Sequence, residues 1–229
     1  TMTDGGALNL TAIKEIYDNS NTNVDIQTDG GLVTINSSNS VGTIANGAIE
    51  VRDSIVGGVV NASGVTWSFT SFSGTGYIGV ADVDFNGASG FTLNVSTSNG
   101  GAINLTGSVK DSSPASLDSA SFNLQTFAVG DDITAVDGAK FHSYGGNINF
   151  NSIDDISLPQ TYSGGGAINL TAGGNVIDIY NGIDLSSDGG VLTINAIGNV
   201  GGTATSTAIE IVDSILDMNL SANNQNVYI

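Results

Sequence analysis

Residues 165–171 read Gly-Gly-Ala-Ile-Asn-Leu-Thr, and almost the same residues stand at 5–11 and at 100–106. In each copy a pair of glycines precedes an alternation of apolar and polar side chains. Alternation with a period of two is typical of a β-strand that buries one of its faces. The glycines suit a turn into that strand, because glycine tolerates positive φ and lets neighbouring turns approach closely. The phrase therefore predicts a turn followed by a half-buried strand.

Related phrases occur elsewhere in the chain and set a period. A looser copy stands at 145–151, and a sister phrase, Asp-Gly-Gly followed by alternating residues, stands at 29–36 and 188–195. Most intervals between the Gly-Gly pairs are near multiples of about 20–25 residues, the size of one turn in many solenoids. An antiparallel sandwich would instead show hairpin signals every 8–12 residues or so. We therefore predict an all-β protein, a parallel β-helix (β-solenoid) with roughly 20–25 residues per coil.

A longer repeat overlies the short one. Residues 48–56 match residues 208–216 at an offset of 160, and the whole of 3–56 recurs as 163–216 with a one-residue slip. We expect residues 1–229 to be a single β-solenoid segment of a longer repetitive protein. The apolar positions of the repeated phrases are expected to point inward and to stack in rows; they are Leu8, Leu10, Ile35, Ile103, Leu105, Ile148, Ile168, Leu170 and Ile194.

The composition excludes several classes of protein. The chain carries 22 acidic residues against four basic ones, a net charge of −18, which argues against binding to nucleic acid or to anionic lipid. Charged residues make up only 11% and apolar residues 40%, so the chain is not of the charge-rich disordered kind. It contains no cysteine, which excludes a disulfide framework and thiolate metal sites. No run of 18 apolar residues occurs, so no membrane-spanning helix is predicted.

The phrases at 165–172 and 188–196 resemble the repeat body of filamentous haemagglutinin-like exoproteins. These are long, right-handed parallel β-helical proteins of bacterial surfaces, many of them exported by two-partner secretion. The resemblance covers most of the chain, is weakest at about 57–95 and 108–143, and does not extend to the N-terminal secretion domain of that family. It implies an extracellular protein of the bacterial cell surface that acts as a fibrous adhesin or scaffold.

We therefore expect a structural or adhesive surface protein that has no catalytic activity and no required cofactor. Its expected partners are further copies of itself, joined end to end or laterally, and a surface polysaccharide or a host or neighbouring cell. The alternative is a carbohydrate-active β-helix enzyme of the polysaccharide lyase or hydrolase kind, or a polysaccharide-binding module. Such enzymes need clustered carboxylates, or calcium with a base, and the four basic residues and the single histidine, His142, supply a base poorly.

Two pairs of neighbouring acidic residues are candidate calcium ligands: Asp131 with Asp132, and Asp154 with Asp155. Carboxylate oxygens are ligands that Ca²⁺ prefers, but the same residues also make and solvate turns. Neither the nonapeptide repeat of calcium-binding β-rolls nor an EF-hand loop is present.

The stretch 67–77 is rich in aromatic residues, and Trp67, Phe69 and Tyr77 within it are candidate ligand contacts. Exposed rings would offer a platform on which sugars stack. The favoured interpretation is that these rings fill the core.

Overall fold

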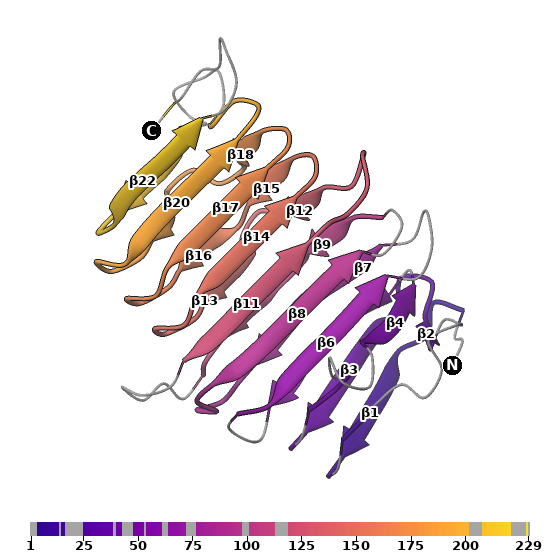
Figure 1. The fold of residues 1–229 in the computed structure, drawn as a ribbon. Coiled ribbons are helices and arrows are strands. Elements are labelled where there is room, and N and C mark those ends of the chain that lie inside the picture. The colour runs from indigo at the N-terminus through magenta and orange to yellow at the C-terminus, as the bar shows by residue number, and fades with distance from the viewer. Residues whose placement is uncertain are drawn as a thin grey trace.

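The computed structural model describes residues 4–13, 15–16, 25–38, 40–42, 48–52, 54–60, 64–71, 77–97, 101–112, 119–201, 208–220 and 228. Within these ranges the chain forms strands and turns and no helix. Every pairing between the described strands is parallel, and each strand pairs with its counterpart in the next coil. The predicted parallel β-solenoid is therefore confirmed (Figure 1).

The spacing of paired residues gives the length of a coil. Ile148 pairs with Ile168, 20 residues later. The pair Leu8 and Val33 is 25 residues apart, and the longest spacing among these examples, 29 residues, separates Leu93 from Phe122. The coil is thus about as long as predicted, with room for turns of different length.

One sheet has nine strands and runs the length of the rod in Figure 1. Its strands, in spatial order, are β2 (Ile26–Gln27), β4 (Ile49–Arg52), β6 (Thr66–Ser71), β8 (Phe91–Thr97), β11 (Ala120–Gln125), β14 (Ile148–Ser152), β17 (Ile168–Ala172), β20 (Val191–Ala196) and β22 (Ile215–Leu220).

The second sheet has thirteen strands and divides partway along the rod. Its undivided part contains β1 (Leu8–Ala12), β3 (Leu32–Ser37), β5 (Ser54–Val60) and β7 (Ile78–Asp84). One branch then contains β9 (Ile103–Leu105), β12 (Ile133–Ala135), β15 (Ile156–Leu158) and β18 (Val176–Asp178). The other contains β10 (Ser108–Lys110), β13 (Lys140–His142), β16 (Gln160–Tyr162), β19 (Ile183–Ser186) and β21 (Glu210–Val212).

The division occurs at β7, whose two halves pair with different strands of the next coil. Ile78 pairs with Ile103 on β9, and Val83 pairs with Val109 on β10. Gly107 lies between the two short strands, where a Cβ would stand only 2.6 Å from the Asp82 amide nitrogen. The coil therefore bends at a residue without a side chain, and one long face becomes two short ones.

The long sequence repeat recurs in the structure, but on the other sheet. Strands β1, β3 and β5 belong to the thirteen-stranded sheet, whereas β17, β20 and β22, which carry the matching sequence, belong to the nine-stranded sheet. Local hydrogen bonds are nevertheless the same in both copies. The Thr28 amide donates to Ser54 Oγ over 2.8 Å, and the Ser187 amide donates to Ser214 Oγ over 3.0 Å. The two copies of the repeat therefore share local hydrogen bonds, although strands of matching sequence belong to different sheets.

The core contains the predicted rows of apolar side chains. Ile35, Ile103, Leu105, Ile148, Ile168, Leu170 and Ile194 are fully buried, and Leu8 and Leu10 are half-buried against the same core. Aromatic rings fill the middle of the rod, next to the division of the thirteen-stranded sheet. Phe141 lies 5.5 Å from both Phe122 and Phe150 between ring centroids, and Phe85 lies 6.0 Å from Phe91. Large rings are suited to a cross-section that changes shape from one coil to the next.

In the part of the chain that the structure describes, no helix has the length and apolar character needed to span a membrane.

Candidate binding surfaces and carboxylate clusters

Four asparagines form a hydrogen-bonded ladder on the outer face of the nine-stranded sheet. Asn123 Nδ2 donates to Asn94 Oδ1 over 2.8 Å, Asn149 Nδ2 donates to Asn123 Oδ1 over 2.7 Å, and Asn169 Nδ2 donates to Asn149 Oδ1 over 2.8 Å. Asn94 Nδ2 continues the ladder to Ser68 Oγ over 3.2 Å. Parallel pairing in register places these identical side chains one above another. The ladder fixes amide groups at the strand spacing of about 4.8 Å.

A second polar row lies beside the ladder, two residues further along each strand. It consists of Gln125, Asn151, Thr171 and Asn195, which pair in register, and Asn151 and Thr171 are exposed. We call the ladder and this row together the polar face. It presents amides and hydroxyls at a regular spacing, an arrangement that can hydrogen-bond to a repetitive polymer.

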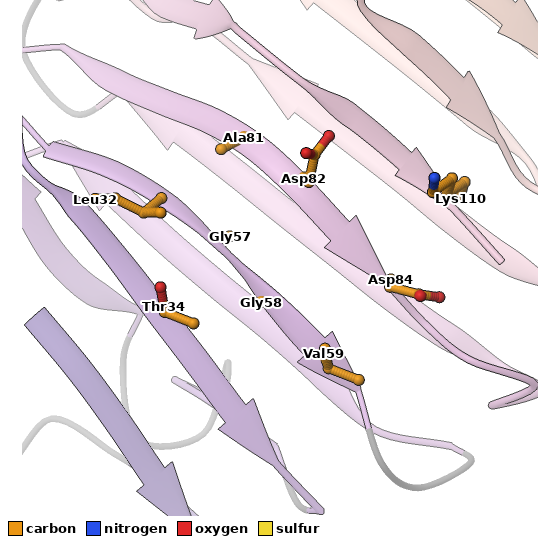
Figure 2. A pocket seen from close by; sticks show the side chains of 9 residues that line it. All are labelled: Leu32, Thr34, Gly57, Gly58, Val59, Ala81, Asp82, Asp84 and Lys110. Atoms are coloured by element: carbon orange, nitrogen blue, oxygen red, sulfur yellow. The ribbon is translucent and has the colours of Figure 1, made fainter. Parts of the chain in front are cut away.

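A groove of about 310 Å³ lies on the outer face of the thirteen-stranded sheet (Figure 2). Its floor is Gly57 and Gly58 on β5, and its walls come from Leu32, Thr34, Val59, Ala81, Asp82, Asp84 and Lys110. A register shift in β5 accompanies the glycines. A Cβ on Gly57 would stand 2.7 Å from the Asp82 carbonyl oxygen, and a Cβ on Gly58 would overlap the backbone of Ile35. Close backbone approach therefore requires these glycines, and the groove follows from it.

The two carboxylates of the groove hold the backbone of the dividing sheet. Asp82 Oδ1 accepts a hydrogen bond from the Ser108 amide over 2.8 Å. Asp84 Oδ1 accepts from the amides of Asn86 and Ser112 over 2.9 and 3.0 Å. Although partial burial acts in the opposite direction, the hydrogen bonds from Ser112 and Asn86 and the charge of Lys110 lower the pKa of Asp84. An ionised, bonded carboxylate suits a structural acceptor and not a general acid.

The four candidate calcium ligands do not form one group. Asp131 is buried, and its carboxylate accepts hydrogen bonds from Thr97 Oγ1 (3.0 Å), the Gly101 amide (2.6 Å) and the Ala128 amide (3.2 Å). It therefore braces a turn, which corrects its assignment as a calcium candidate.

Asp132, Asp154 and Asp155 do come together. Their carboxylate oxygens lie within 4.8 Å of one another, and all three side chains are half-exposed. Each carboxylate also accepts a backbone amide: Asp132 from Asp155 (3.0 Å), Asp154 from Gly130 (3.3 Å) and Asp155 from Asn175 (2.5 Å). Burial first, and then the charges of Asp155, Asp154 and Asp131, raises the pKa of Asp132. The three carboxylates therefore stabilise turns by accepting backbone amides, and solvent reaches all of them.

A second carboxylate cluster was not predicted from the sequence. Asp178, Asp184 and Glu210 also bring carboxylate oxygens within 4.8 Å of one another, and the two aspartates are buried. The long repeat could have indicated that Asp184 and Glu210 belong together, because their counterparts Asp25 and Glu50 occur in the first copy. In both copies the glutamate amide donates to the aspartate Oδ2, over 3.2 Å from Glu50 and 3.0 Å from Glu210.

The aromatic candidates divide between core and surface. Trp67 is 0% and Phe69 1% exposed, and their ring centroids lie 6.5 Å apart inside the solenoid. Burial corrects their assignment as ligand contacts and agrees with the core interpretation. Tyr77 is half-buried. His142, the one histidine, stacks on Tyr144 with ring centroids 3.6 Å apart, and burial lowers its pKa against the opposing effect of Asp111.

Comparison with protein-family models, curated proteins and solved structures finds no match to this chain. The resemblance to filamentous haemagglutinin-like exoproteins therefore stays a prediction from the repeated phrases.

Proposed function

We propose that this chain is a rod-like structural or adhesive element of a bacterial cell surface, that it has no catalytic activity, and that it associates end to end with further copies of itself. The main support is the parallel pairing of strands, which continues from coil to coil along the described chain. Among the described strands, β1 pairs only with β3 and β22 pairs only with β20. A stack of parallel strands can be extended by one more parallel strand, supplied either by further coils of the same polypeptide or by another copy. The extracellular location rests on the resemblance of the repeated phrases to surface exoproteins.

Two charged substitutions at one end of the rod test this association. If β1 stacks in register on β22 of another copy, Asn9 enters the row that contains Asn169, Thr193 and Asp217. Asn9→Asp then adds an acidic residue in register with Asp217, and Thr11→Asp adds a second negative charge to an edge that must approach a chain with a net charge of −18; like charges opposite each other destabilise strand pairing. We expect the wild type to form concentration-dependent oligomers in sedimentation velocity and filaments in electron micrographs, and the double variant to stay monomeric.

The matched control is Thr171→Asp, which adds a charge to the side of the rod and should leave association intact. A wild type that stays monomeric at high concentration, or a double variant that assembles as well as the wild type, would contradict end-to-end association.

A second candidate function, polysaccharide binding, is favoured by the polar face. Exposed amides and hydroxyls such as Asn151 and Thr171 are groups that hydrogen-bond to sugars. With a net charge of −18, the chain should bind neutral polysaccharides and repel acidic ones. Binding assays with immobilised neutral and acidic polysaccharides would test this, with Asn151→Ala/Thr171→Ala expected to weaken binding to the neutral ones. Release of reducing ends or of unsaturated products would contradict the absence of catalysis.

A further inference from the structure

Three carboxyl groups from two successive coils meet where β18, β19 and β21 come together. Asp178 ends β18, Asp184 lies on β19, and Glu210 begins β21, the neighbour of β19 in the next coil. Asp178 is 4% and Asp184 0% exposed. All three groups can place an oxygen within 4.8 Å of the others. Glu210 is half-buried, so the cluster concentrates acidic groups where two of the three side chains are shielded from water.

These carboxylates lack the partners that buried charges require. The Glu210 amide donates to Asp184 Oδ2 over 3.0 Å, and the Tyr180 amide donates to Asp178 Oδ1 over 2.7 Å. Asp184 Oδ1 and Glu210 Oε2 are also buried, and no N–H group or hydroxyl of the described residues donates to either. The carboxyl group of Asp184 is within hydrogen-bonding reach of those of Asp178 and Glu210, a contact that needs a shared proton or a bridging cation. An ionised carboxylate buried without a counter-charge costs several kcal/mol, so positive charge must be supplied by protons or by a cation.

The chain supplies no such charge from the groups that act on Asp184. Asp178 and Glu210 are both acidic, and the side chains of Tyr162 and Tyr180, which lie near them, contain no basic group. Burial first, with the charges of Asp178 and Glu210 in addition, raises the pKa of Asp184 to about 8. Burial likewise raises the pKa of Asp178. Without a cation the cluster would therefore hold a proton near neutral pH.

We propose that Asp178, Asp184 and Glu210 bind one divalent cation of the hard, oxygen-preferring class, typified by Ca²⁺, and that this ion fastens two successive coils. Oxygens bound to one Ca²⁺ lie about 2.3–2.6 Å from it, so no two of them are more than about 5 Å apart. The 4.8 Å limit within the cluster satisfies that condition. Ca²⁺ tolerates irregular coordination, whereas Mg²⁺ demands a near-ideal octahedron. A ligand set without sulfur or imidazole disfavours softer metals.

Among the residues that the structure describes, the other cluster of three carboxyl groups lacks this combination. In the cluster of Asp132, Asp154 and Asp155 every side chain is half-exposed, so water can solvate its charges. The repeat counterpart, Asp25 and Glu50, has Arg52 two residues further along the same strand, where the second copy has Val212. The first copy thus carries a basic residue in the sequence, and the second does not.

The test compares metal-free protein with protein to which Ca²⁺ has been added. We expect Ca²⁺ to raise the Tm of the wild type, and calorimetric titration to show one ion bound per chain. Tb³⁺, a luminescent substitute for Ca²⁺, should be sensitised by the nearby Tyr162 and Tyr180. Asp184→Asn and, separately, Glu210→Gln should each reduce Ca²⁺ affinity at least tenfold. The control Asp154→Asn, in the solvent-exposed cluster, should keep the wild-type affinity.

Several outcomes would overturn the proposal. One is a wild type whose Tm and calorimetric trace do not respond to Ca²⁺. Another is a metal-free Asp184→Asn protein that is more stable than the metal-free wild type while Ca²⁺ stabilises neither, because the cluster is then neutralised by a proton alone. A third is Ca²⁺ binding that Asp154→Asn abolishes and Glu210→Gln does not. If Asp184→Asn does not fold, Glu210→Gln and the wild-type titration still decide the question.

Discussion

Gly166 lies so close to the backbone of Gly146, in the preceding coil, that a Cβ on Gly166 would overlap the Gly146 carbonyl oxygen and stand 2.6 Å from the carbonyl carbon. The same relationship joins Gly190 to Gly166, Gly146 to Ala120 and Gly31 to Gly6. In these four pairs the second glycine is therefore required by the stacking of coils and not by a positive φ, which falls on the first glycine, Gly30, Gly145, Gly165 or Gly189. In the copy at 100–106 the positive φ falls instead on the second glycine, Gly101.

Gly166→Ala should destabilise the rod by about 1–3 kcal/mol, because one coil must move away from the next to admit the methyl group. The midpoint of urea unfolding measures this loss. Gly64→Asn is the control, since Gly64 has a φ of +70° that asparagine tolerates and no atom within 4 Å of an added Cβ. Equal stability of Gly166→Ala and the wild type would show that close coil stacking is not needed.

Asn149→Ala should cost about 1–2 kcal/mol, because it removes one hydrogen bond to Asn123 and another from Asn169. Thermal unfolding followed by circular dichroism would show the loss. Asn151→Ala, at an exposed position on the same strand, should change the stability by less than about 0.5 kcal/mol. If the two variants lose the same amount, the ladder contributes no more than an ordinary surface amide.

Asp131→Ala should destabilise by about 3 kcal/mol, because three donors lose their acceptor in a buried turn. The loss should be the same with and without calcium, since this carboxylate already has its partners. Asp137→Ala, in an exposed turn nearby, should have little effect. A loss for Asp131→Ala that added calcium modulates would restore Asp131 as a metal ligand.

The contribution of His142 to stability should be lost as the pH is lowered from 7 to 5, whereas carboxyl groups with a raised pKa, such as Asp184, act in the opposite direction. Burial lowers the pKa of His142 below its usual 6.5, so the unfolded chain takes up a proton on this residue before the folded chain does. Stability present above pH 6.5 is therefore lost as the pH falls toward the lower folded pKa. His142→Gln should lose less stability over this interval. The difference between the two proteins isolates the histidine, because the carboxyl groups are common to both, and identical pH profiles would contradict this assignment.

Local sequence patterns predicted the coil but not the exchange of sheets. The alternation around Ile168 and Leu170 specifies which side chains face inward, because a strand has a strict period of two. The exchange depends instead on the division at β7, on the bend at Gly107 and on the aromatic rings that fill the altered cross-section. Strand β7 and most of these rings fall in stretches where the repeat is weakest, and Gly107 directly follows a copy of the repeated phrase, so no periodic signal could reveal the division.

The carboxylate sites show a similar limit. Asp131 and Asp132 are neighbours in the sequence and were therefore predicted together as calcium ligands. In the structure Asp131 accepts a hydrogen bond from Thr97, whereas Asp132 accepts one from the Asp155 amide. Asp184 and Glu210 lie 26 residues apart in the chain and meet only because one coil stacks on another. Contacts between coils depend on the length of each turn, which the repeat determines only approximately.

Because the two copies of the long repeat lie on different sheets, the same sequence motif is displayed on two sides of the rod. The sister phrase lies on β3 at 29–36 and on β20 at 188–195, on two sheets that face away from their shared core in different directions. A receptor specific for that phrase would meet it twice on one molecule, at two bearings around the axis. Each rod would then be bivalent, able to cross-link two receptors that have no room side by side, with a gain in avidity that a single display site does not give.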